Sequence, residues 1–437
     1  MKPYHYDEAF FLIYIYNMIN RKVAPEFNSL IEISLPPLNS FKLQNGQTVY
    51  FISNSNLEVF RLEIVFRAGS YFGNKYGASY FTSKMLLGGT SSKASAELIE
   101  SFDKFGGFLE ISQNFERLQV VLHGLNRYFE NYLPHLIDLI YNSIFPKEEL
   151  DIQKNISNQS FLVNNEKASF EASSIFKKNL YGEDHFLGKT LNSNEIDVIE
   201  NSDIIDFYTK QIAHSEFDIF LSGNVSDKEL AILDSYFSRN RNLKKGGKSI
   251  VLPEIMPTFN VSVTKLESLQ TSIRMGKMLI NRKHPDFYKF IVFNTLFGGY
   301  FGSRLMTNIR EEKGYTYGIS SSLVPLASDG YFVIGSDVKK EFAQNTIDEI
   351  FKEIEILKTQ KVEEEELSLV KSYMTGSILG STNTVFDIID KHKSVYYEQL
   401  NPNFYNELLP NIMSISAHDI QYIANTYMSD LSIVCVG

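Results

Sequence analysis

Alternating and periodic hydrophobic positions divide the chain into short strands and amphipathic helices. Arg61 to Phe66 (RLEIVF) and Leu118 to Leu122 are apolar and β-rich, which predicts strands with a buried face. An Asn45-Gly46 turn joins two short strands within LQNGQTVYFISNSN. Apolar residues at helical spacing predict helices over Ala94 to Phe105, Phe129 to Ile144 and Glu148 to Lys178.

The second half of the chain repeats the pattern of the first. Each half ends in a helix-like segment followed by an apolar strand: NSDIIDFYTKQI runs into EFDIFLSG, and SAHDIQYIANTY runs into LSIVCVG. A polar, basic stretch between the halves, SRNRNLKKGGKS, is typical of an exposed linker. We therefore predict an α+β fold with two duplicated domains. The predicted boundaries are an N-terminal extension over 1–24, a first domain over 25–237, a linker over 238–255 and a second domain over 256–437.

Composition and charge narrow the class of protein. The chain has 437 residues, of which 43% are hydrophobic and 22% charged, and this excludes a disordered or fibrous chain. A net charge of -10 argues against partners that are nucleic acids or anionic membranes. Cys435 is the only cysteine, so an internal disulfide framework and a thiolate zinc cluster are excluded. We expect a cytoplasmic location.

The N-terminus carries an apolar run, AFFLIYIY, over residues 9–16. This run is far shorter than the roughly 20 residues that a membrane-spanning helix needs. Asp7 and Glu8 precede it, where a signal peptide carries positive charge. We therefore expect a translated extension or a loosely docked arm.

Isolated motifs give no catalytic centre. No two of the eight histidines lie three or four residues apart, so no helix face presents a histidine pair to zinc. The acidic run Glu363 to Glu366 is typical of a solvated helix start. The segment FGGYFGSRL, Phe297 to Leu305, lacks the Lys-Ser/Thr of a phosphate-binding loop and predicts a flexible turn before a helix.

Several motifs, taken in order, resemble the insulinase-type (M16) metallopeptidases, which include mitochondrial processing peptidase. GASYFTSKMLLGGT, from Gly77 to Thr90, is similar to the family's zinc-site helix, where GLAHFLEHMLFKGT carries an inverted HxxEH motif. The frame residues that match are Gly77, Met85, Leu86, Gly89 and Thr90. Further similarities follow in the family's order: LQNG at 43–46, FRAGS at 66–70, FGG at 105–107, HFLG at 185–188, and SRLMTNIREEKGYTYGISS from residue 303.

The resemblance implies two α/β-roll domains of the M16 (LuxS/MPP-like metallohydrolase) type. Such a chain forms half of a clamshell, and two of them close around a chamber that holds extended peptides. Peptide substrates are therefore the implied ligands.

The zinc-binding positions of the family are replaced in this chain. The two histidines become Tyr80 and Lys84, and the catalytic glutamate becomes Ser83. The third ligand, a downstream glutamate, falls near Gln159. A lysine ammonium offers zinc no lone pair, and a serine is no general base for water attack. We therefore expect no metal in this chain, with Tyr80 and Lys84 filling the vacated pocket.

The family's second pair of functional residues is retained. Its C-terminal domain supplies an arginine and a tyrosine that reach substrate, and the matching residues are Arg310 and Tyr317. A guanidinium can hold a carbonyl or carboxylate, and a phenol can donate to an oxyanion. The alternative is structural: an arginine at a helix C-terminus favours the dipole, and a strand tyrosine often only packs.

The resemblance thus implies a subunit that is not active alone. In the first interpretation, the chain is the non-catalytic subunit of a heterodimeric M16 peptidase whose sister subunit carries HxxEH and zinc. In the alternative, it is a non-proteolytic peptide-binding or scaffold protein that retains the fold.

Overall fold

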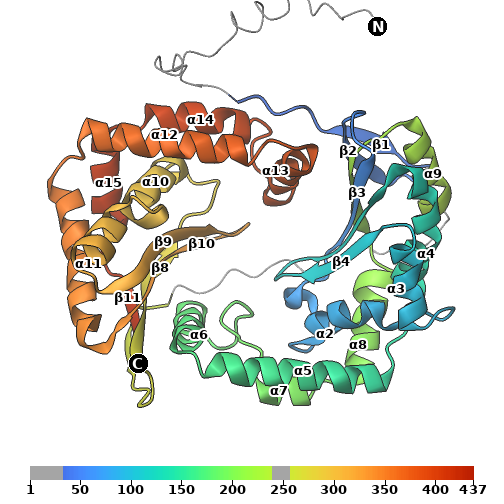
Figure 1. Ribbon diagram of the computed structural model, residues 1–437, viewed down its shortest axis with the longest axis horizontal. Helices are drawn as coiled ribbons and strands as arrows, with labels where there is room; N and C mark the ends of the chain where they lie inside the picture. Colours follow the sequence, from blue (N-terminus) through green and yellow to red (C-terminus); the bar gives the residue numbers. More distant parts are fainter. Residues whose placement is uncertain (1–32, 239–255) are drawn as a thin grey trace, which may run out of the picture.

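The computed structural model describes residues 33–238 and 256–437. The predicted N-terminal extension, and the predicted linker apart from Ser238, lie outside these residues. The described residues form two halves, each built on its own sheet and carrying helices (Figure 1). The predicted α+β class with two similar units is therefore confirmed.

The N-terminal half contains a six-stranded mixed sheet with the strand order β1-β2-β6-β3-β5-β4. β2 and β6 are parallel, and the other neighbours are antiparallel. The Asn45-Gly46 turn joins β1 to β2, with Gly46 at a φ of 88°. The strands are β1 (Asn39–Lys42), β2 (Thr48–Ser53), β3 (Val59–Phe66), β4 (Phe108–Gln113), β5 (Leu118–Leu125) and β6 (Phe217–Gly223).

Amphipathic helices bury their apolar faces against this sheet in one large core. The α4 residues predicted to face the core are buried or half-buried, but Ile144 is 43% exposed because α4 ends at Asn142. The predicted helical segment from Glu148 to Lys178 is two helices, α5 and α6. The helices are α2 (Ala78–Met85), α3 (Ser95–Asp103), α4 (Phe129–Asn142), α5 (Lys147–Asn165), α6 (Ala168–Tyr181), α7 (Ser193–Asp197), α8 (Asn201–Tyr208) and α9 (Asp227–Phe237).

The C-terminal half contains a five-stranded sheet with the order β7-β11-β8-β10-β9, so β9 lies at an edge. The strands are β7 (Asn260–Val263), β8 (Gln270–Leu279), β9 (Thr316–Pro325), β10 (Gly330–Lys339) and β11 (Ser432–Val436). The acidic run from Glu363 caps and begins α12, as predicted. The helices are α10 (Phe287–Asn294), α11 (Ala343–Thr359), α12 (Glu364–Gly380), α13 (Val385–Glu398), α14 (Phe404–Ser414) and α15 (Ala417–Tyr427).

The two halves exchange one helix each. α6 of the N-terminal half packs on β8 and β11 of the C-terminal sheet, where Phe176 joins Val434 in a buried cluster. α13 of the C-terminal half packs on β2 and β6 of the N-terminal sheet, where Ile389 joins Phe220. Each half therefore completes the core of the other. Together, the elements of the two halves are arranged in a ring (Figure 1).

A buried ion network fastens α13 to the N-terminal sheet. Glu63 on β3, with a side chain only 3% exposed, pairs with Arg61 at 2.8 Å and also with Lys393 of α13. Asp390 of α13 accepts from Arg61 at 2.9 Å and from Lys393 at 2.7 Å. The network offsets the cost of burying Glu63, and it couples the two halves electrostatically.

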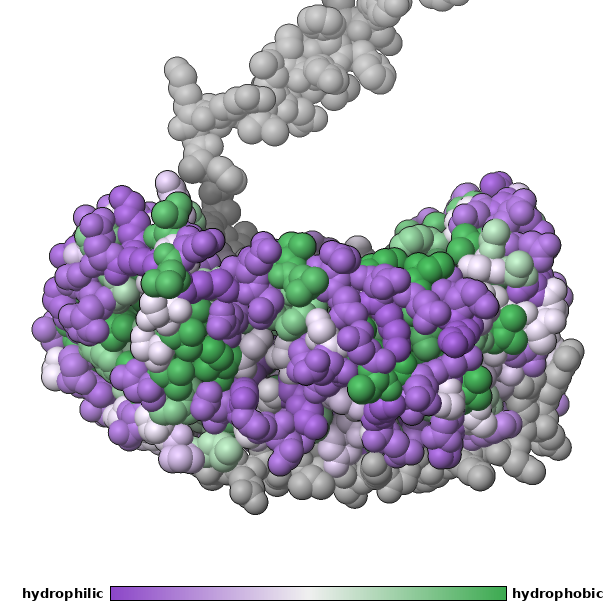
Figure 2. Space-filling model, turned by 90° about the horizontal axis from the view of Figure 1, so that it is seen from below, coloured by the Kyte–Doolittle hydropathy of each residue, from purple (hydrophilic) through white to green (hydrophobic). Residues whose placement is uncertain are grey.

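α5 runs along the lower side of the molecule, beside α7 (Figure 1). Only Leu150 and Ser157 of this helix are buried, whereas Ile152, Ile156 and Val163 are more than half exposed. Seen from below, apolar residues form separate patches divided by polar ones (Figure 2). Among the described residues, no helix has the length and apolar character needed to cross a membrane.

Candidate functional site

The first candidate site lies on α2, which follows a loop anchored by Tyr76. The helix begins after Gly77, whose φ of 94° lies in the left-handed region that favours glycine. The Tyr76 phenol donates to the Lys189 carbonyl at 3.0 Å. Burial, reinforced by Glu195, raises the pKa of Tyr76 to about 12, so this phenol stays protonated and remains a donor near neutral pH. The loop before α2 is thereby tied to the segment after α6.

The three replaced zinc-motif residues meet on one face of α2. The Ser83 hydroxyl is buried and donates to the Tyr80 carbonyl at 2.7 Å. The Lys84 ammonium lies 5.6 Å from the centroid of the Tyr80 ring, a cation–π contact. The predicted grouping of these side chains is therefore found. Lys84, however, is exposed, so the prediction that it fills the vacated pocket is wrong.

α5 brings to this face a residue that the sequence analysis did not name. Ser157 is buried, and its hydroxyl lies 3.4 Å from the Tyr80 hydroxyl. Gln159, two residues later, is exposed and points away from the helix face that contacts α2. Ser157 lies two helical turns after the buried Leu150, so both residues lie on the same face of α5. This helical spacing of buried positions was the signal that could have located Ser157.

This set of side chains does not suit a zinc ion. Hydroxyls and an ammonium replace the imidazoles and carboxylates that bind zinc in proteins. The Ser83 hydroxyl is already engaged with the helix backbone. Over residues 33–238 and 256–437, no three His, Cys, Asp or Glu side chains come close enough to hold a metal ion.

The second candidate site lies in the C-terminal half. Arg310 is in the π-helical segment η6 (Met306–Glu312), and Tyr317 follows on β9, as the sequence predicted. The Arg310 guanidinium lies 4.5 Å from the centroid of the Phe301 ring. Phe301 is itself 64% exposed, so this pair forms a cationic and aromatic surface beside the sheet edge.

A β-bulge directs Tyr317 away from the protein. The register of β9 against β10 shifts between Ser336 and Val338, where Tyr317 and Gly318 on β9 oppose Asp337 on β10. Such a bulge re-aims the side chain that it carries. Tyr317 is 92% exposed, the largest exposed fraction among the large hydrophobic side chains in the described residues. The structural alternative, a tyrosine used for packing, therefore does not describe Tyr317.

Models of one family match most of the chain. Residues 48–187 match the insulinase family, peptidase family M16, and residues 199–374 match the peptidase M16 inactive domain. The chain therefore belongs to the M16 family, as the motifs indicated.

Relatives of similar length carry two kinds of name, zinc protease and non-peptidase homolog. An uncharacterized zinc protease of Rickettsia felis is 26% identical over 408 residues, covering 90% of this chain and 96% of the relative. The uncharacterized zinc protease YmxG of Bacillus subtilis is 25% identical over 378 residues, covering 82% and 90%. A relative from Helicobacter pylori, 22% identical over 402 residues and covering 89% and 91%, is named a non-peptidase homolog.

Solved structures share the fold over almost the whole length. A peptidase M16 inactive domain from Pseudomonas fluorescens superposes with a TM-score of 0.82 at 24% identity, covering 92% of this chain and 98% of that one. A protease from Helicobacter pylori gives a TM-score of 0.81 at 17% identity, covering 92% and 100%. The half-clamshell architecture implied by the sequence motifs is thus confirmed.

Proposed function

We propose that this chain is the catalytically incomplete subunit of a heterodimeric M16 zinc peptidase. A sister subunit carries HxxEH and zinc, and this chain contributes chamber wall and contacts to the peptide. The observation that carries the proposal is the face of α2, where Ser83, Lys84 and Ser157 of α5 each contact Tyr80 and leave zinc no suitable ligand. Both subunits act in the cytoplasm, since a chain with one cysteine suits a reducing compartment.

Arg310 and Tyr317 are the groups that this chain contributes to the reaction. Tyr317 is exposed and aimed outward by the bulge, so its phenol can donate to the oxyanion that forms when water attacks a peptide bond. The Arg310 guanidinium is held against Phe301 and can bind a carbonyl or carboxylate of the peptide. Both groups act on substrate, whereas the partner's site supplies the activated water.

The open edge of β9 provides a second means of holding a peptide. β9 is paired with a strand only on its β10 side, so its outer edge can accept an added strand along the part that is not covered by Met306, whose Sδ accepts from the Ile319 N–H. Main-chain hydrogen bonds of this kind place few demands on peptide sequence. Tyr317 lies at the start of this strand, beside any peptide that it holds.

A second candidate function is peptide binding or scaffolding without proteolysis. The observation in its favour is the Helicobacter pylori relative named a non-peptidase homolog, which covers 89% of this chain. In this alternative the exposed β9 edge still binds extended chains, and the replaced α2 face has no catalytic partner.

Substitution of Arg310 and Tyr317 in the assembled heterodimer separates the two functions. With a peptidase subunit, Arg310→Ala and Tyr317→Ala lower turnover while the elution volume of the heterodimer stays unchanged. With a scaffold, neither substitution alters the function of the complex. Cleavage by this chain alone, with zinc bound at one equivalent, contradicts both functions.

A further inference from the structure

The glycine-rich turn between η5 (Thr295–Gly299) and η6 lies beside Arg310 and is not among the groups assigned to the reaction. The sequence predicted a turn before a helix at this place, and a turn is present. Contacts at both ends fix this turn against β9 and against α12. The turn therefore presents Phe301, the residue at its centre, in one defined place.

The first end of the turn is held against β9 by Gly298. A Cβ atom at Gly298 would lie 2.6 Å from the Oγ atom and 2.8 Å from the backbone nitrogen of Ser321, so only glycine fits there. Ser321 is itself fixed, because it is buried and its hydroxyl donates to Oδ1 of Asn294 at 2.9 Å. The turn thus begins in direct contact with the strand that carries Tyr317.

The second end of the turn is held against α12. The rings of Tyr300 and Tyr373 contact each other, with centroids 4.7 Å apart. A Cβ atom at Gly302 would lie 2.9 Å from Cε2 of Tyr300, so the backbone folds closely around that ring. Arg304, directly after the turn, donates twice to the carboxylate of Glu366 on α12, at 2.8 and 2.7 Å. This end therefore cannot move without losing contacts to α12.

Phe301 projects from the turn between these two anchors. Its ring is 64% exposed, so folding gains little from burying it. The ring instead contacts Arg310, whose guanidinium carbon lies 4.5 Å from the ring centroid. In the described part of the chain, no hydrogen bond or ion pair involves the Arg310 side chain, so Phe301 is the group that restrains its charged end.

This restraint affects how Arg310 can bind. An arginine side chain without a partner samples many rotamers, and it loses that freedom when it binds a ligand. A ring that contacts the guanidinium beforehand removes part of this cost. Because the contact uses the π face of the ring, the N–H donors of Arg310 stay available for a carbonyl or carboxylate.

We propose that Phe301 is the positioning residue for Arg310. Its ring restrains the guanidinium before the peptide binds, and the anchored turn over residues 298–302 fixes the ring. The inference rests on the proposed function, in which Arg310 binds a carbonyl or carboxylate of the peptide. Phe301 acts through Arg310 and not on the reacting atoms.

Arginine side-chain NMR on the full-length chain tests the contact without a sister subunit. Phe301→Leu removes the ring but keeps an apolar side chain, whereas Phe301→Trp keeps an aromatic face. Comparison with Arg310→Lys identifies the Arg310 signals. We expect the Arg310 Hδ resonances to be shifted upfield in wild type and in Phe301→Trp, and to lose this shift in Phe301→Leu. Unchanged Arg310 resonances in Phe301→Leu overturn the proposal.

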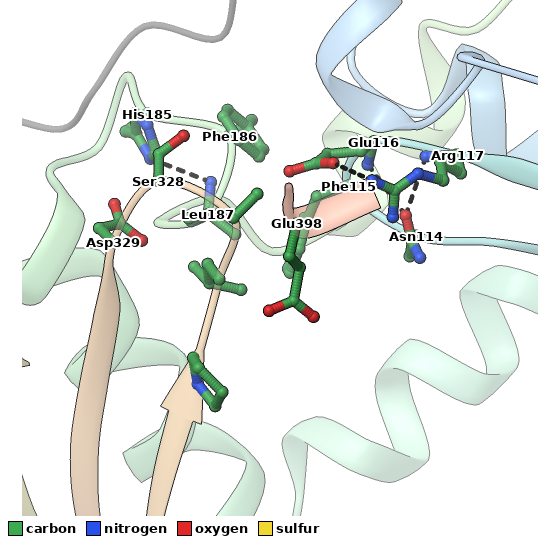
Figure 3. A pocket seen from close by; sticks show the side chains of 13 residues that line it. Asn114, Phe115, Glu116, Arg117, His185, Phe186, Leu187, Ser328, Asp329 and Glu398 are labelled. Carbon is green, nitrogen blue, oxygen red and sulfur yellow. Dashed lines mark hydrogen bonds and ion pairs between the residues drawn. The ribbon is translucent and has the colours of Figure 1, made fainter. Parts of the chain in front are cut away.

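Phe115→Leu is the matched control for this measurement. Phe115 is 36% exposed and contacts Phe186, with ring centroids 5.6 Å apart, in the cavity where the two halves meet (Figure 3). This cavity shares no residue with the turn over 298–302. We therefore expect Phe115→Leu to leave the Arg310 resonances unchanged. A change as large as that in Phe301→Leu overturns the proposal, because the Arg310 signals then report no specific contact.

Kinetics on the assembled heterodimer test the role of the contact. We expect Phe301→Leu to lower kcat/KM about 2- to 5-fold, the loss that an exposed cation–π contact predicts, and Phe301→Trp to restore it. In an Arg310→Ala background, Phe301→Leu should have no further effect, because the group that it positions is absent. An equal loss with and without Arg310 overturns the proposal.

The two measurements separate this inference from the proposed function. A heterodimer that does not cleave peptides, with the Arg310 resonances still dependent on the Phe301 ring, contradicts the proposed function and supports the contact. A heterodimer whose cleavage depends on Arg310 but not on Phe301 supports the proposed function and overturns the positioning role.

Discussion

The Ser157 hydroxyl on α5 lies 3.4 Å from the Tyr80 hydroxyl on α2. In the zinc-dependent arrangement that the motifs resemble, these two helices supply ligands to one metal ion. Here the two helices are bridged by two hydroxyls. The two helices therefore meet through groups that are poor zinc ligands.

Rebuilding the ligand set should restore zinc binding. The variant Tyr80→His, Ser83→Glu, Lys84→His and Ser157→Glu places two imidazoles and two carboxylates on the faces where α2 and α5 meet. We expect about one zinc per chain after dialysis, measured by mass spectrometry of the metal content. In a matched control, Gln159→Glu replaces Ser157→Glu and retains much less zinc, because residue 159 is exposed. Equal zinc in both variants would refute the assignment of Ser157.

Loss of the Tyr317 hydroxyl should slow the assembled peptidase. Tyr317→Phe removes one donor to the oxyanion but keeps the ring, and removal of such a donor lowers kcat about 100-fold. Steady-state kinetics on the heterodimer measures this, with KM changing little. Tyr373→Phe, at a tyrosine on α12 that is 47% exposed, serves as the control and should leave kcat unchanged. Equal kcat for Tyr317→Phe and wild type would assign Tyr317 no part in the reaction.

Removal of Lys393 should destabilise both halves together. Lys393→Met leaves Glu63 buried with Arg61 as its remaining partner. Because breaking a buried pair costs roughly 3–5 kcal/mol when no partner remains, we expect a loss of about 2–3 kcal/mol in the free energy of unfolding. Denaturant titration measures it, and both halves should unfold in one transition. Lys210→Met, which breaks an exposed pair with Asp206, should cost less than about 1 kcal/mol.

Asp218 should give stability an unusual dependence on pH. This carboxylate lies under α13, where it accepts from Tyr396 at 3.1 Å and from Tyr397 at 3.0 Å. Burial raises the pKa of Asp218, although both phenols favour the ionised form. Because the folded state then binds the proton more tightly, the contribution of Asp218 is fully present below its ordinary pKa and is lost as pH rises through the raised value.

The variant Asp218→Asn checks this sign. The asparagine side chain cannot ionise. The melting temperature of the variant minus that of wild type should therefore increase as the pH rises from 4 to 8. Thermal scans of both proteins across this range measure the difference. A gap that narrows with rising pH would mean that the phenol hydrogen bonds outweigh burial and lower the pKa.

Local pattern was sufficient to predict most elements, whereas the zinc-motif positions came from the resemblance to the M16 family. Alternation located β3 and β5, and helical spacing placed Tyr80, Ser83 and Lys84 on one face. These features depend on residues near one another in sequence, so the backbone period alone decides them.

Features that depend on distant contacts could not be predicted in this way. The exchange of α6 and α13 is a choice of packing partner, and an amphipathic face does not reveal which sheet it will meet. Ser157 was missed because its role follows from the packing of α5 on α2. The bulge at Tyr317 depends on the register of β9 against β10, which the alternation of β9 does not encode.

Zinc content and peptide cleavage, measured on the purified chain alone and again after a sister chain with HxxEH is added, test the central claim most directly. We predict no zinc and no cleavage for the chain alone, and one zinc per heterodimer with cleavage that requires both chains. A chain that binds one zinc and cleaves peptides without a sister subunit would contradict the account.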